Sequence, residues 1–409
     1  MAEIEIEIEI PPYFLCPISL DIMRDPVTVS TGITYERESI EKWVFTQKKA
    51  SCPATKQHLD NLELTPNITL RRLIQSWCTL HATHGVQRLP TPKAPLTRPH
   101  LLHILSQASR PHLQSQALQT LKSIASDNLT NKRCMAAAGV PEFLAALIVT
   151  KSSSHDQLSD FQKTSEDALS IIYALQLPES ALKPLCTAAF VEALTLIMQI
   201  GSYESQSYAI MLLKSMLEVA DPSLLITLKP EFFSEIVKIL KAEDISRKGR
   251  KSALKVLMAA CPWGRNRMKA VEAGVVAVVI DLLLDTSEKR ACEMMLTVVD
   301  MVCQCADGRS ELLGHAAGLA VVSKKILRVS QGASERAVRI LHSVSRFSAT
   351  AAVLAEMMQS GVVAKLCLVM QVDCGAKTKE KAREILKAHA RAWRTSPCIP
   401  YNLISSYPS

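Results

Sequence analysis

The stretch VEAGVVAVVIDLL, residues 271–283, decides how most of this chain folds, because variants of it recur along the sequence. Each variant has a turn at a small residue or a proline, followed by apolar residues at helical spacing. The other copies are AAAGVPEFLAALI (136–148), CTAAFVEALTLIM (186–198), KPEFFSEIVKIL (229–240), HAAGLAVVSKKIL (315–327) and MQSGVVAKLCLVM (358–370). The successive turn residues, at intervals of 50, 41, 44, 44 and 43 residues, are Gly139, Ala189, Pro230, Gly274, Gly318 and Gly361. This recurrence predicts a stack of similar helical units.

A second helical pattern, which begins with an alanine, recurs between these copies. Ala253, Val256, Leu257 and Ala260 stand at i, i+3, i+4 and i+7, on one helical face. The same spacing starts at Ala168, Ala209, Ala291 and Ala337. A small residue lets neighbouring helices approach closely, and a repeat of roughly 42 residues made of two or three helices is typical of an armadillo or HEAT solenoid. We therefore expect an all-α armadillo solenoid over residues 100–395, with about six repeats and degenerate outer ones.

The N-terminal region contains what resemble two halves of a zinc site, and neither half is complete. In FLCPISLDIMRDPV (14–27), Cys16 is followed three positions later by Ser19, and in SCPATK (51–56) Cys52 is followed by Thr55. A two-zinc RING module needs eight ligands, with cysteines paired as C-x2-C. Residues 11–84 contain no such pair and supply only Cys16, Cys52, Cys78, His58, His81 and His84. We expect neither a metal nor another cofactor.

Residues 11–84 nevertheless have the patterns of a small α+β module. DPVTVSTGITY (25–35) predicts two short strands around a Ser-Thr-Gly turn. Ile40, Trp43 and Val44 share one face of a predicted helix. A second helix is predicted after Asn67, a suitable N-cap, with Leu70, Leu73, Ile74 and Trp77 on its inward face.

Without zinc, the two loops need another source of rigidity. We hypothesise that the hydroxyls of Ser19 and Thr55 brace them through polar contacts, together with Asp25 and Arg37. Ordinary loop capping is the alternative role for each of these residues. Cys16 is interpreted as a buried scaffold residue rather than a reactive thiol.

The remaining segments differ in composition and charge. We expect residues 1–10 to be an acidic tail, residues 85–99, with four prolines, to be a semi-rigid linker, and residues 396–409 to be a second tail. Residues 1–84 carry eight Lys and Arg against eleven Asp and Glu, whereas the rest of the chain has a net charge of +11. The first residues resemble no secretory signal and no apolar run is long enough to cross a membrane, so we expect a cytoplasmic protein, with the nucleus as a second location.

Three segments of the N-terminal module together resemble the U-box, the zinc-free relative of the RING. They are FLCPISLDIMRDPVTVSTGITYERESIEKW, CPATKQHL and LTPNITLRRLIQSW. Followed by a proline-rich linker and armadillo repeats, they resemble the plant U-box/armadillo ubiquitin ligases, in the short group associated with immune and stress signalling. Glu36 departs from the family pattern, which usually has Asp there, and glutamate is a weaker helix cap.

The resemblance implies a ubiquitin ligase that binds a ubiquitin-conjugating enzyme charged with ubiquitin and holds no covalent intermediate itself. Such a ligase acts by proximity, so no catalytic nucleophile is expected in this chain. The family's docking positions fall on Ile18, Leu20, Trp43 and Pro53. Lys56 could contact the conjugating enzyme or ubiquitin, or could simply be solvated, and core packing is the alternative role of Trp43.

The positive charge of the repeats indicates which kind of protein substrate we expect them to recruit. SRKGRK (246–251) and RNRMK (265–269) are basic clusters, from which the candidate groove residues are Arg247, Lys248, Arg250, Arg265 and Arg267. They predict binding of an acidic substrate segment, and the alternative is a solvated helix surface. Nucleic acid is an unlikely partner because no aromatic residues interleave with the charges. A non-catalytic armadillo scaffold or carrier with a vestigial U-box is the alternative function.

Overall fold

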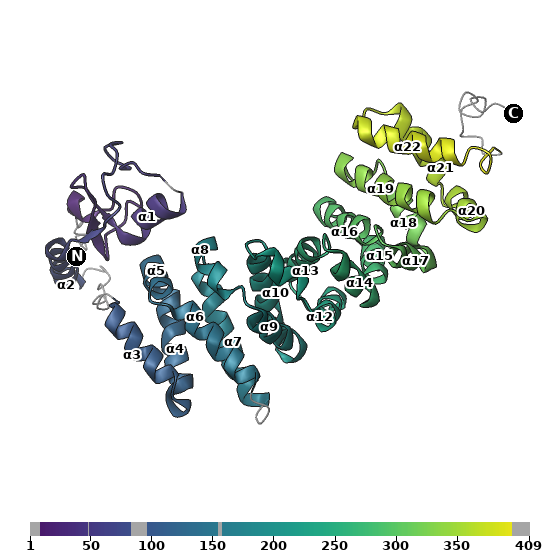
Figure 1. The fold of residues 1–409 in the computed structure, drawn as a ribbon. Helices are drawn as coiled ribbons and strands as arrows, with labels where there is room; N and C mark the ends of the chain where they lie inside the picture. Colours follow the sequence, from purple (N-terminus) through teal and green to yellow (C-terminus); the bar gives the residue numbers. More distant parts are fainter. Residues whose placement is uncertain (1–8, 48, 83–95, 154–157, 395–409) are drawn as a thin grey trace, which may run out of the picture. The chain divides into compact units, whose positions relative to one another are not determined.

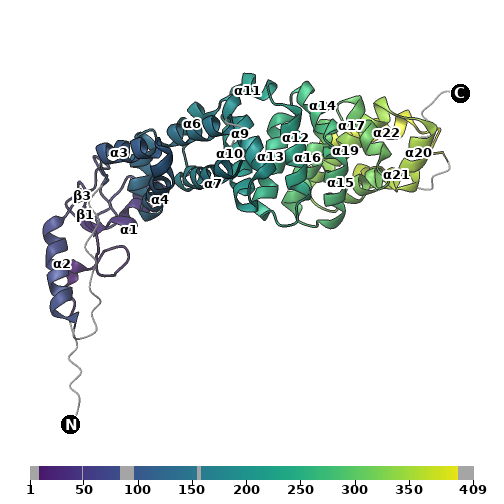
Figure 2. The same cartoon turned by 90° about the horizontal axis from the view of Figure 1, so that it is seen from below.

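The computed structural model describes residues 9–47, 49–82, 96–153 and 158–394. The chain divides into two compact units, Met1–Arg110 with Ser123–Ala138, and Pro111–Lys122 with Gly139–Ser409. Most of the predicted N-terminal tail, residues 85–95 of the predicted linker and the predicted C-terminal tail lie outside the described residues. Figure 1 shows helices through most of the chain, and Figure 2 labels two of the short strands near its start, β1 and β3.

The N-terminal module is the predicted small α+β fold. Its elements are the 3-10 turn Pro12–Phe14, β1 (Pro26–Thr28), β2 (Thr34–Glu36), α1 (Arg37–Glu41), the π-helical turn Lys42–Thr46, β3 (Thr65–Pro66) and α2 (Ile68–Leu80). The antiparallel sheet has the order β2-β1-β3, with Val27 opposite both Tyr35 and Pro66. The two predicted strands are confirmed. β3 was not predicted, because two residues are too short to show an alternating pattern.

The core of this module lies between the sheet and the two helices. Val27, Tyr35, Ile40 and Ile74 are fully buried in it. The prediction for Leu73 is wrong: its side chain is 53% exposed. The surface that α2 faces is too narrow to bury every apolar residue on one side of the helix. The helix buries Ile74, as predicted, and Cys78, and it leaves Leu73 exposed.

Asn67 joins the second helix to the sheet. Its side-chain oxygen accepts the backbone N–H of Leu70 at 3.0 Å, which confirms the predicted N-cap. Its amide nitrogen lies 3.3 Å from the hydroxyl of Thr34 on β2. The cap therefore fixes where α2 begins and also how it meets the strands.

The rest of the chain is the predicted solenoid. Its helices are α3 (Arg98–Ala108), α4 (Pro111–Asp127), α5 (Leu129–Ala137), α6 (Val140–Ser152), α7 (Leu158–Leu175), α8 (Glu179–Leu182), α9 (Ala188–Ile200), α10 (Tyr203–Leu217), α11 (Pro222–Ile226), α12 (Pro230–Lys241), α13 (Arg247–Ala260), α14 (Gly264–Glu272), α15 (Val275–Asp285), α16 (Lys289–Val302), α17 (Ala306–Gly314), α18 (Gly318–Lys325), α19 (Gln331–Phe347), α20 (Ala351–Gln359), α21 (Val362–Gln371) and α22 (Ala376–Ala388). α3 begins at Arg98, inside the predicted linker 85–99, because Pro99 is compatible with the first turn of a helix.

Two continuous rows of helices run through the repeats. α7, α10, α13, α16, α19 and α22 contact one another in that order, and so do α6, α9, α12, α15, α18 and α21. Figures 1 and 2 show these rows running side by side through the second unit. Among the described residues no single helix is both long and apolar enough to cross a membrane, and three sharply bent helix pairs meet that test only when their two members are combined.

The recurrent turn residues have different backbone conformations at equivalent places. Gly139, Gly274 and Gly361 precede α6, α15 and α21 with φ of +84°, +85° and +74°, which other residues rarely adopt. Gly318 has no positive φ, but a Cβ there would lie 2.1 Å from the carbonyl oxygen of Leu312. Sequence similarity among the repeats therefore reflects two separate requirements for glycine.

The predicted alanines lie in the helix row formed by α7, α10, α13, α16 and α19. Ala168, Ala209, Ala253 and Ala337 are fully buried, and Ala291 is 8% exposed. Consecutive helices of the row contact one another, and the burial of these alanines agrees with the prediction that small residues permit close stacking.

We predict that Ala209→Leu lowers the free energy of unfolding by about 1–3 kcal/mol, because the larger side chain overpacks the contact between α10 and its neighbours. Urea unfolding followed by circular dichroism measures this change. The control is Ala352→Leu, at an exposed position of α20. Equal stability of the two variants would contradict the close-packing explanation.

Candidate functional site

The first incomplete zinc half-site is a loop closed by its own backbone. The N–H of Cys16 donates to the carbonyl of Asp21 at 2.9 Å, and the N–H of Leu20 donates to the carbonyl of Cys16 at 2.8 Å. Just outside the loop, Leu15 and Ile22 form an antiparallel bridge. The loop is therefore a hydrogen-bonded ring that needs no ion to close it.

The second half-site has the same construction. The N–H of Cys52 donates to the carbonyl of Gln57 at 2.8 Å, and the N–H of Lys56 donates to the carbonyl of Cys52 at 2.9 Å. A bridge between Ser51 and His58 flanks it. The two loops therefore share the same hydrogen bonds at the same spacing, although neither contains a glycine.

The fifth residue of each loop adopts a left-handed backbone. Leu20 has φ of 61° and Lys56 has φ of 62°. This conformation costs free energy in residues with a side chain, so it persists only where surrounding bonds enforce it. Both side chains are exposed, Leu20 at 72%. The strained turns thus hold one apolar and one cationic side chain out toward solvent.

The sulfur of Cys16 joins the first loop to the sheet. It is fully buried and accepts backbone N–H groups from Ile18 at 3.4 Å and from Glu36 on β2 at 3.2 Å. The carboxylate of Glu36 accepts the N–H groups of Arg24 at 2.6 Å and Asp25 at 3.1 Å. Glu36 precedes α1 without capping it through its side chain, and it instead holds the segment that follows the first loop.

The sulfur of Cys52 joins the second loop to the same strand. It lies 2.9 Å from the hydroxyl of Tyr35 on β2 and accepts the hydroxyl of Thr31 at 3.3 Å. Burial raises the pKa of the Cys52 thiol, but hydroxyl donors from Thr31, Thr55 and Tyr35 outweigh it and lower the pKa to about 6. The Tyr35 oxygen also accepts the N–H of Ala54 at 3.1 Å. Hydroxyl groups thus surround a sulfur that a zinc ion would bind in a RING.

The predicted bracing residues differ in the contacts that they make. Asp25 lies 2.5 Å from Arg37 and 3.4 Å from Arg71, so the structure brings the predicted pair together and adds an arginine that sequence reasoning missed. Thr55 lies in the second loop beside Cys52. Ser19 is exposed, and within the described residues its hydroxyl has no hydrogen-bond partner. The role hypothesised for Ser19 is therefore wrong, and Glu36 tethers the first loop instead.

The predicted docking residues are at the surface of both loops. Ile18 and Leu20 are 36% and 72% exposed on the first loop, and Pro53 is half-buried on the second. Trp43, in the π-helical turn, is half-buried, and its indole N–H donates to the carbonyl of Ser51 at 2.7 Å. Trp43 therefore contacts the core and also anchors the entry to the second loop.

Two cations lie over the Trp43 ring. The Nζ atom of Lys49 is 3.9 Å from the ring centroid, and that of Lys56 is 5.8 Å from it. Both distances are within the range of cation–π attraction. Lys56 was predicted as a docking residue but not as a partner of Trp43, and Lys49 was missed because no sequence pattern links it to Trp43.

The predicted groove residues of the solenoid do not form one cluster. Arg247 and Lys248 begin α13, while Arg265 and Arg267 begin α14, beyond the far end of a 14-residue helix that is about 20 Å long. The guanidinium of Arg250 donates to the carbonyl of Ala242 at 2.8 Å, so it acts within the fold. Of the five predicted residues, Lys248 lines a hollow on the α7–α10–α13–α16 side.

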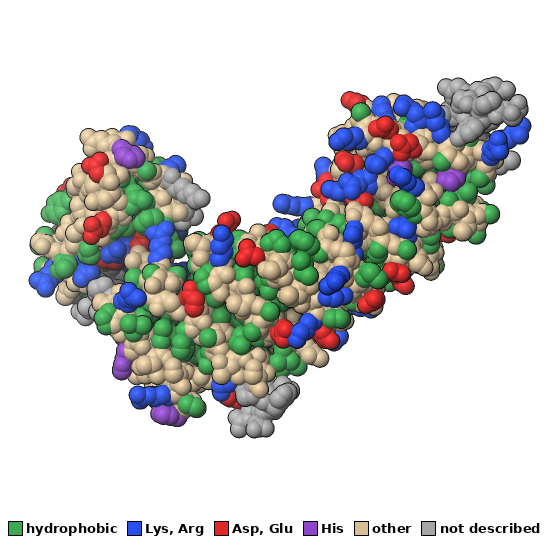
Figure 3. All heavy atoms as spheres, in the orientation of Figure 1, with side chains coloured by type: hydrophobic (Ala, Val, Ile, Leu, Met, Phe, Trp, Pro, Cys, Tyr) green, Lys and Arg blue, Asp and Glu red, His purple; other side chains and the backbone are tan. Residues whose placement is uncertain are grey.

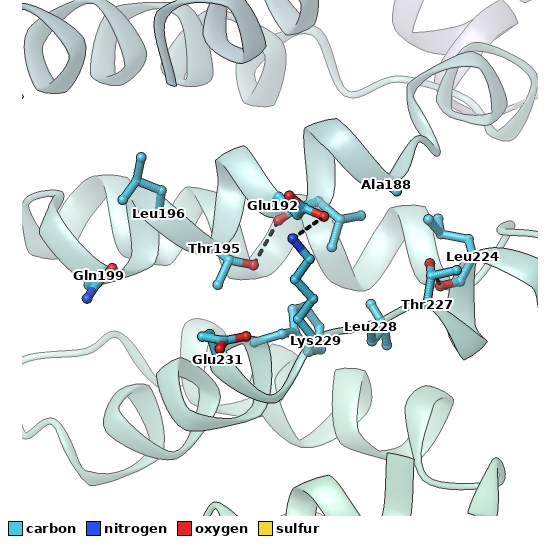
Figure 4. A pocket seen from close by; sticks show the side chains of 12 residues that line it. Ala188, Glu192, Thr195, Leu196, Gln199, Leu224, Thr227, Leu228, Lys229 and Glu231 are labelled. Carbon is cyan, nitrogen blue, oxygen red and sulfur yellow. Dashed lines mark hydrogen bonds and ion pairs between the residues drawn. The ribbon is translucent and has the colours of Figure 1, made fainter. Parts of the chain in front are cut away.

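A second hollow lies between α9 and α12, in a different helix row. Its volume is about 300 Å³, and Val191, Leu228 and Phe232 supply apolar walls. Figure 4 shows Glu192 and Lys229 meeting across it as an ion pair, 2.8 Å apart. Lys229 is thus matched within the hollow, whereas Glu231, which also lines it, has no ion pair among the described residues, so the hollow offers no positive charge to an anionic ligand.

Cysteines elsewhere in the described part of the chain do not form a metal site. Cys303 and Cys305 form a C-x-C pair in the sequence, but Cys303 is fully buried, and burial raises the pKa of its thiol. Cys305 donates to the carbonyl of Val302 at 3.1 Å. Across the described residues, no three His, Cys, Asp or Glu side chains meet in a way that could hold a metal ion.

We predict that Glu36→Ala loosens the first loop, because two N–H groups, of which that of Asp25 is partly buried, lose their acceptor at a cost of about 1–3 kcal/mol. Trypsin cleavage after Arg24, followed by mass spectrometry, should then be about 5-fold faster or more. Glu36→Gln, which keeps an acceptor oxygen, should show a smaller change. The control Glu38→Ala removes only an exposed pair with Lys42, and it should cleave like the wild type. Equal rates for Glu36→Ala and wild type would refute the tether.

Two known families match the chain. The U-box domain matches residues 10–83, and the plant U-box protein ARM repeat region matches residues 100–409. E3 ubiquitin-protein ligase PUB23 of Arabidopsis thaliana is 57% identical over 410 residues, which cover 98% of both chains. E3 ubiquitin-protein ligase PUB22 of the same plant is 54% identical over 433 residues, or 98% of this chain and 99% of that one.

A likeness to a solved structure concerns the fold alone. The crystal structure of an engineered protein matches with a TM-score of 0.51 and 18% identity, covering 73% of this chain and 71% of the other. The family matches and the two relatives bear on activity as well, because they cover both the loop region and the repeats. The chain belongs to the plant U-box E3 ubiquitin-protein ligases with an armadillo repeat region, and it is a U-box-type ubiquitin transferase.

Proposed function

We propose that the two loops of the U-box bind a ubiquitin-conjugating enzyme charged with ubiquitin, and that the armadillo repeats recruit the protein substrate. Ubiquitin then passes from the thioester of the conjugating enzyme to a substrate lysine. The observation that carries this proposal is the pair of loops closed by the same backbone hydrogen bonds, the first of which holds Ile18 and Leu20 out to solvent. Exposed apolar anchors on a rigid support are what a small docking interface requires.

The chain's own contribution to transfer is proximity. Holding the thioester and the lysine together raises their effective concentration, so no group on this chain needs to become acylated. Cys52 has a lowered thiol pKa, but its side chain is fully buried beneath Tyr35 and Thr31. A buried sulfur cannot receive ubiquitin from another protein, which agrees with transfer without a covalent intermediate.

The alternative is a non-catalytic scaffold or carrier whose U-box no longer binds a conjugating enzyme. The exposed Ile18 and Leu20 argue against it, since a vestigial surface has no reason to hold a leucine in a left-handed turn. The proposal also includes a cytoplasmic location, with the nucleus as a second one, and a role in plant immune or stress responses. These rest on the family resemblance.

We predict that Ile18→Ala combined with Leu20→Ala abolishes most self-ubiquitination, because the anchors are lost while the buried core remains. Purified full-length protein is incubated with ubiquitin, activating enzyme, ATP and a panel of conjugating enzymes. The control Leu73→Ala removes an exposed leucine of the same module, on α2. It should retain wild-type activity.

Trp43→Ala is expected to reduce chain formation as well, through loss of the bond to Ser51 and of the ring beneath Lys49 and Lys56. Circular dichroism checks that each variant is folded. If wild type and the double variant make equally few chains with every conjugating enzyme, the scaffold explanation replaces the ligase.

A further inference from the structure

A hollow of about 420 Å³ opens on the solenoid side formed by α7, α10, α13 and α16. Five cationic side chains line it: Lys214 of α10, Lys248, Lys251 and Lys255 of α13, and Arg290 of α16. No carboxylate belongs to the described residues that line it. Figure 1 shows α10, α13 and α16 as consecutive members of one helix row. Three successive repeats thus direct positive charge into one hollow.

The spacing on α13 explains why three lysines converge. Lys248, Lys251 and Lys255 stand at i, i+3 and i+7, so they lie on one face of the helix. That face also carries the buried Ser252 beside them. In the sequence SRKGRK appears as a single basic run. The shared face of Lys248, Lys251 and Lys255 becomes visible only once the helix is known.

Most of this charge is not neutralised within the fold. Lys214 pairs with Glu218 at 2.7 Å, and Lys251 pairs with Glu288. Within the described residues, Lys248, Lys255 and Arg290 have no carboxylate at ion-pair distance. Three like charges around one hollow repel one another, and an anion placed between them would relieve that repulsion.

In the repeats that follow, two arginines of α19 form ion pairs within the fold. Arg336 and Arg339 of α19 both bind Asp300 of α16, at 3.0 Å and 3.1 Å, and Asp300 is 5% exposed. Figure 3 shows Lys and Arg side chains interspersed with acidic ones over the α19–α22 end. Arg336 and Arg339 are therefore matched by a carboxylate within the fold, in contrast to Lys248 and Lys255 at the hollow.

The hollow also has an apolar wall. Met211 and Met294 line it, and methionine adapts to ligands of different shape. Tyr173 is present too, but its ring already stacks on Tyr208, with centroids 4.6 Å apart. A wall of methionines beside lysines fits a peptide with an apolar and an anionic side chain. Single-stranded nucleic acid would instead need several free aromatic faces.

We propose that this hollow binds a peptide segment of a protein substrate in which an anionic side chain lies next to an apolar one. The anion is either a phosphorylated serine or threonine, or adjoining aspartate and glutamate residues, since both satisfy the same unpaired cations. This inference rests on the proposed function of the repeats in substrate recruitment, and it names the chemical class of the segment and the residues that select it.

The test measures binding of fluorescent 13-residue peptide libraries to the full-length protein by anisotropy. The central position is fixed as phosphoserine, as Asp-Glu, as serine or as Lys-Lys, and the other positions are degenerate. The groove variant combines Lys248→Gln, Lys255→Gln and Arg290→Gln. The matched control combines Lys241→Gln, Lys324→Gln and Arg383→Gln, three exposed cations that do not line the hollow.

We expect the wild type to prefer one or both anionic libraries, with affinity that falls as salt is raised from 50 to 200 mM. The groove variant should bind them about 10-fold more weakly, since each exposed ion pair contributes a few-fold. The control variant should stay within about 2-fold of the wild type. Preference for phosphoserine alone assigns a phosphorylated segment, and equal preference for Asp-Glu assigns a carboxylate segment.

Three outcomes would overturn the proposal: equal binding by the groove variant and the wild type, equal binding of the serine or Lys-Lys library, or tighter binding of a 12-nucleotide single-stranded RNA. Self-ubiquitination, measured in parallel, separates this inference from the proposed function. The groove variant should form chains like the wild type, because its changes lie far from the U-box in sequence. If the wild type forms none, the ligase proposal fails while the anisotropy still decides the anion site.

Discussion

The structure of the U-box depends on β2, where two consecutive residues hold the two loops. Tyr35 turns its side chain to the sulfur of Cys52, and Glu36 gives its N–H to the sulfur of Cys16 and its carboxylate to the backbone after the first loop. Because successive residues of a strand face opposite ways, one short strand can reach both loops. The loops are closed by their own backbones and then fixed to a common support. Their exposed side chains are thereby presented without the ions that a RING uses.

The solenoid depends on close stacking of its repeats, which a few small residue types make possible. Buried alanines on consecutive helices let the repeats stack closely, and glycines permit the turns between helices. Close stacking brings side chains from successive repeats side by side, so that Lys214, Lys248 and Arg290 meet at one hollow although they are far apart in sequence. A rigid stack can therefore gather more positive charge around one hollow than any single repeat supplies there.

The sequence predicted the elements better than the contacts between them. Periodicity located the solenoid helices, the alanine row, the two strands and the Asn67 cap, because each is a local pattern. It failed for Leu73, since periodicity does not say how wide a buried stripe is. The prediction also failed for Ser19. Because Ser19 stands where a RING has a zinc ligand, it was expected to brace the loop in place of the ion. The structure instead gives this role to Glu36, whose carboxylate binds the backbone that follows the loop. The basic run at 246–251 contained Lys248, but Lys255 and Arg290 became its partners only through helical geometry and stacking.

The central claim is that the U-box loops are rigid without metal because their own hydrogen bonds close them and β2 fixes them. Hydrogen exchange of the full-length protein, resolved at the Leu20 and Lys56 amides that close the two loops, tests it most directly. The account predicts slow exchange at both amides, unchanged by a zinc chelator, with no zinc found in the purified protein. Rapid exchange at either amide, or exchange that accelerates when the chelator is added, would contradict it.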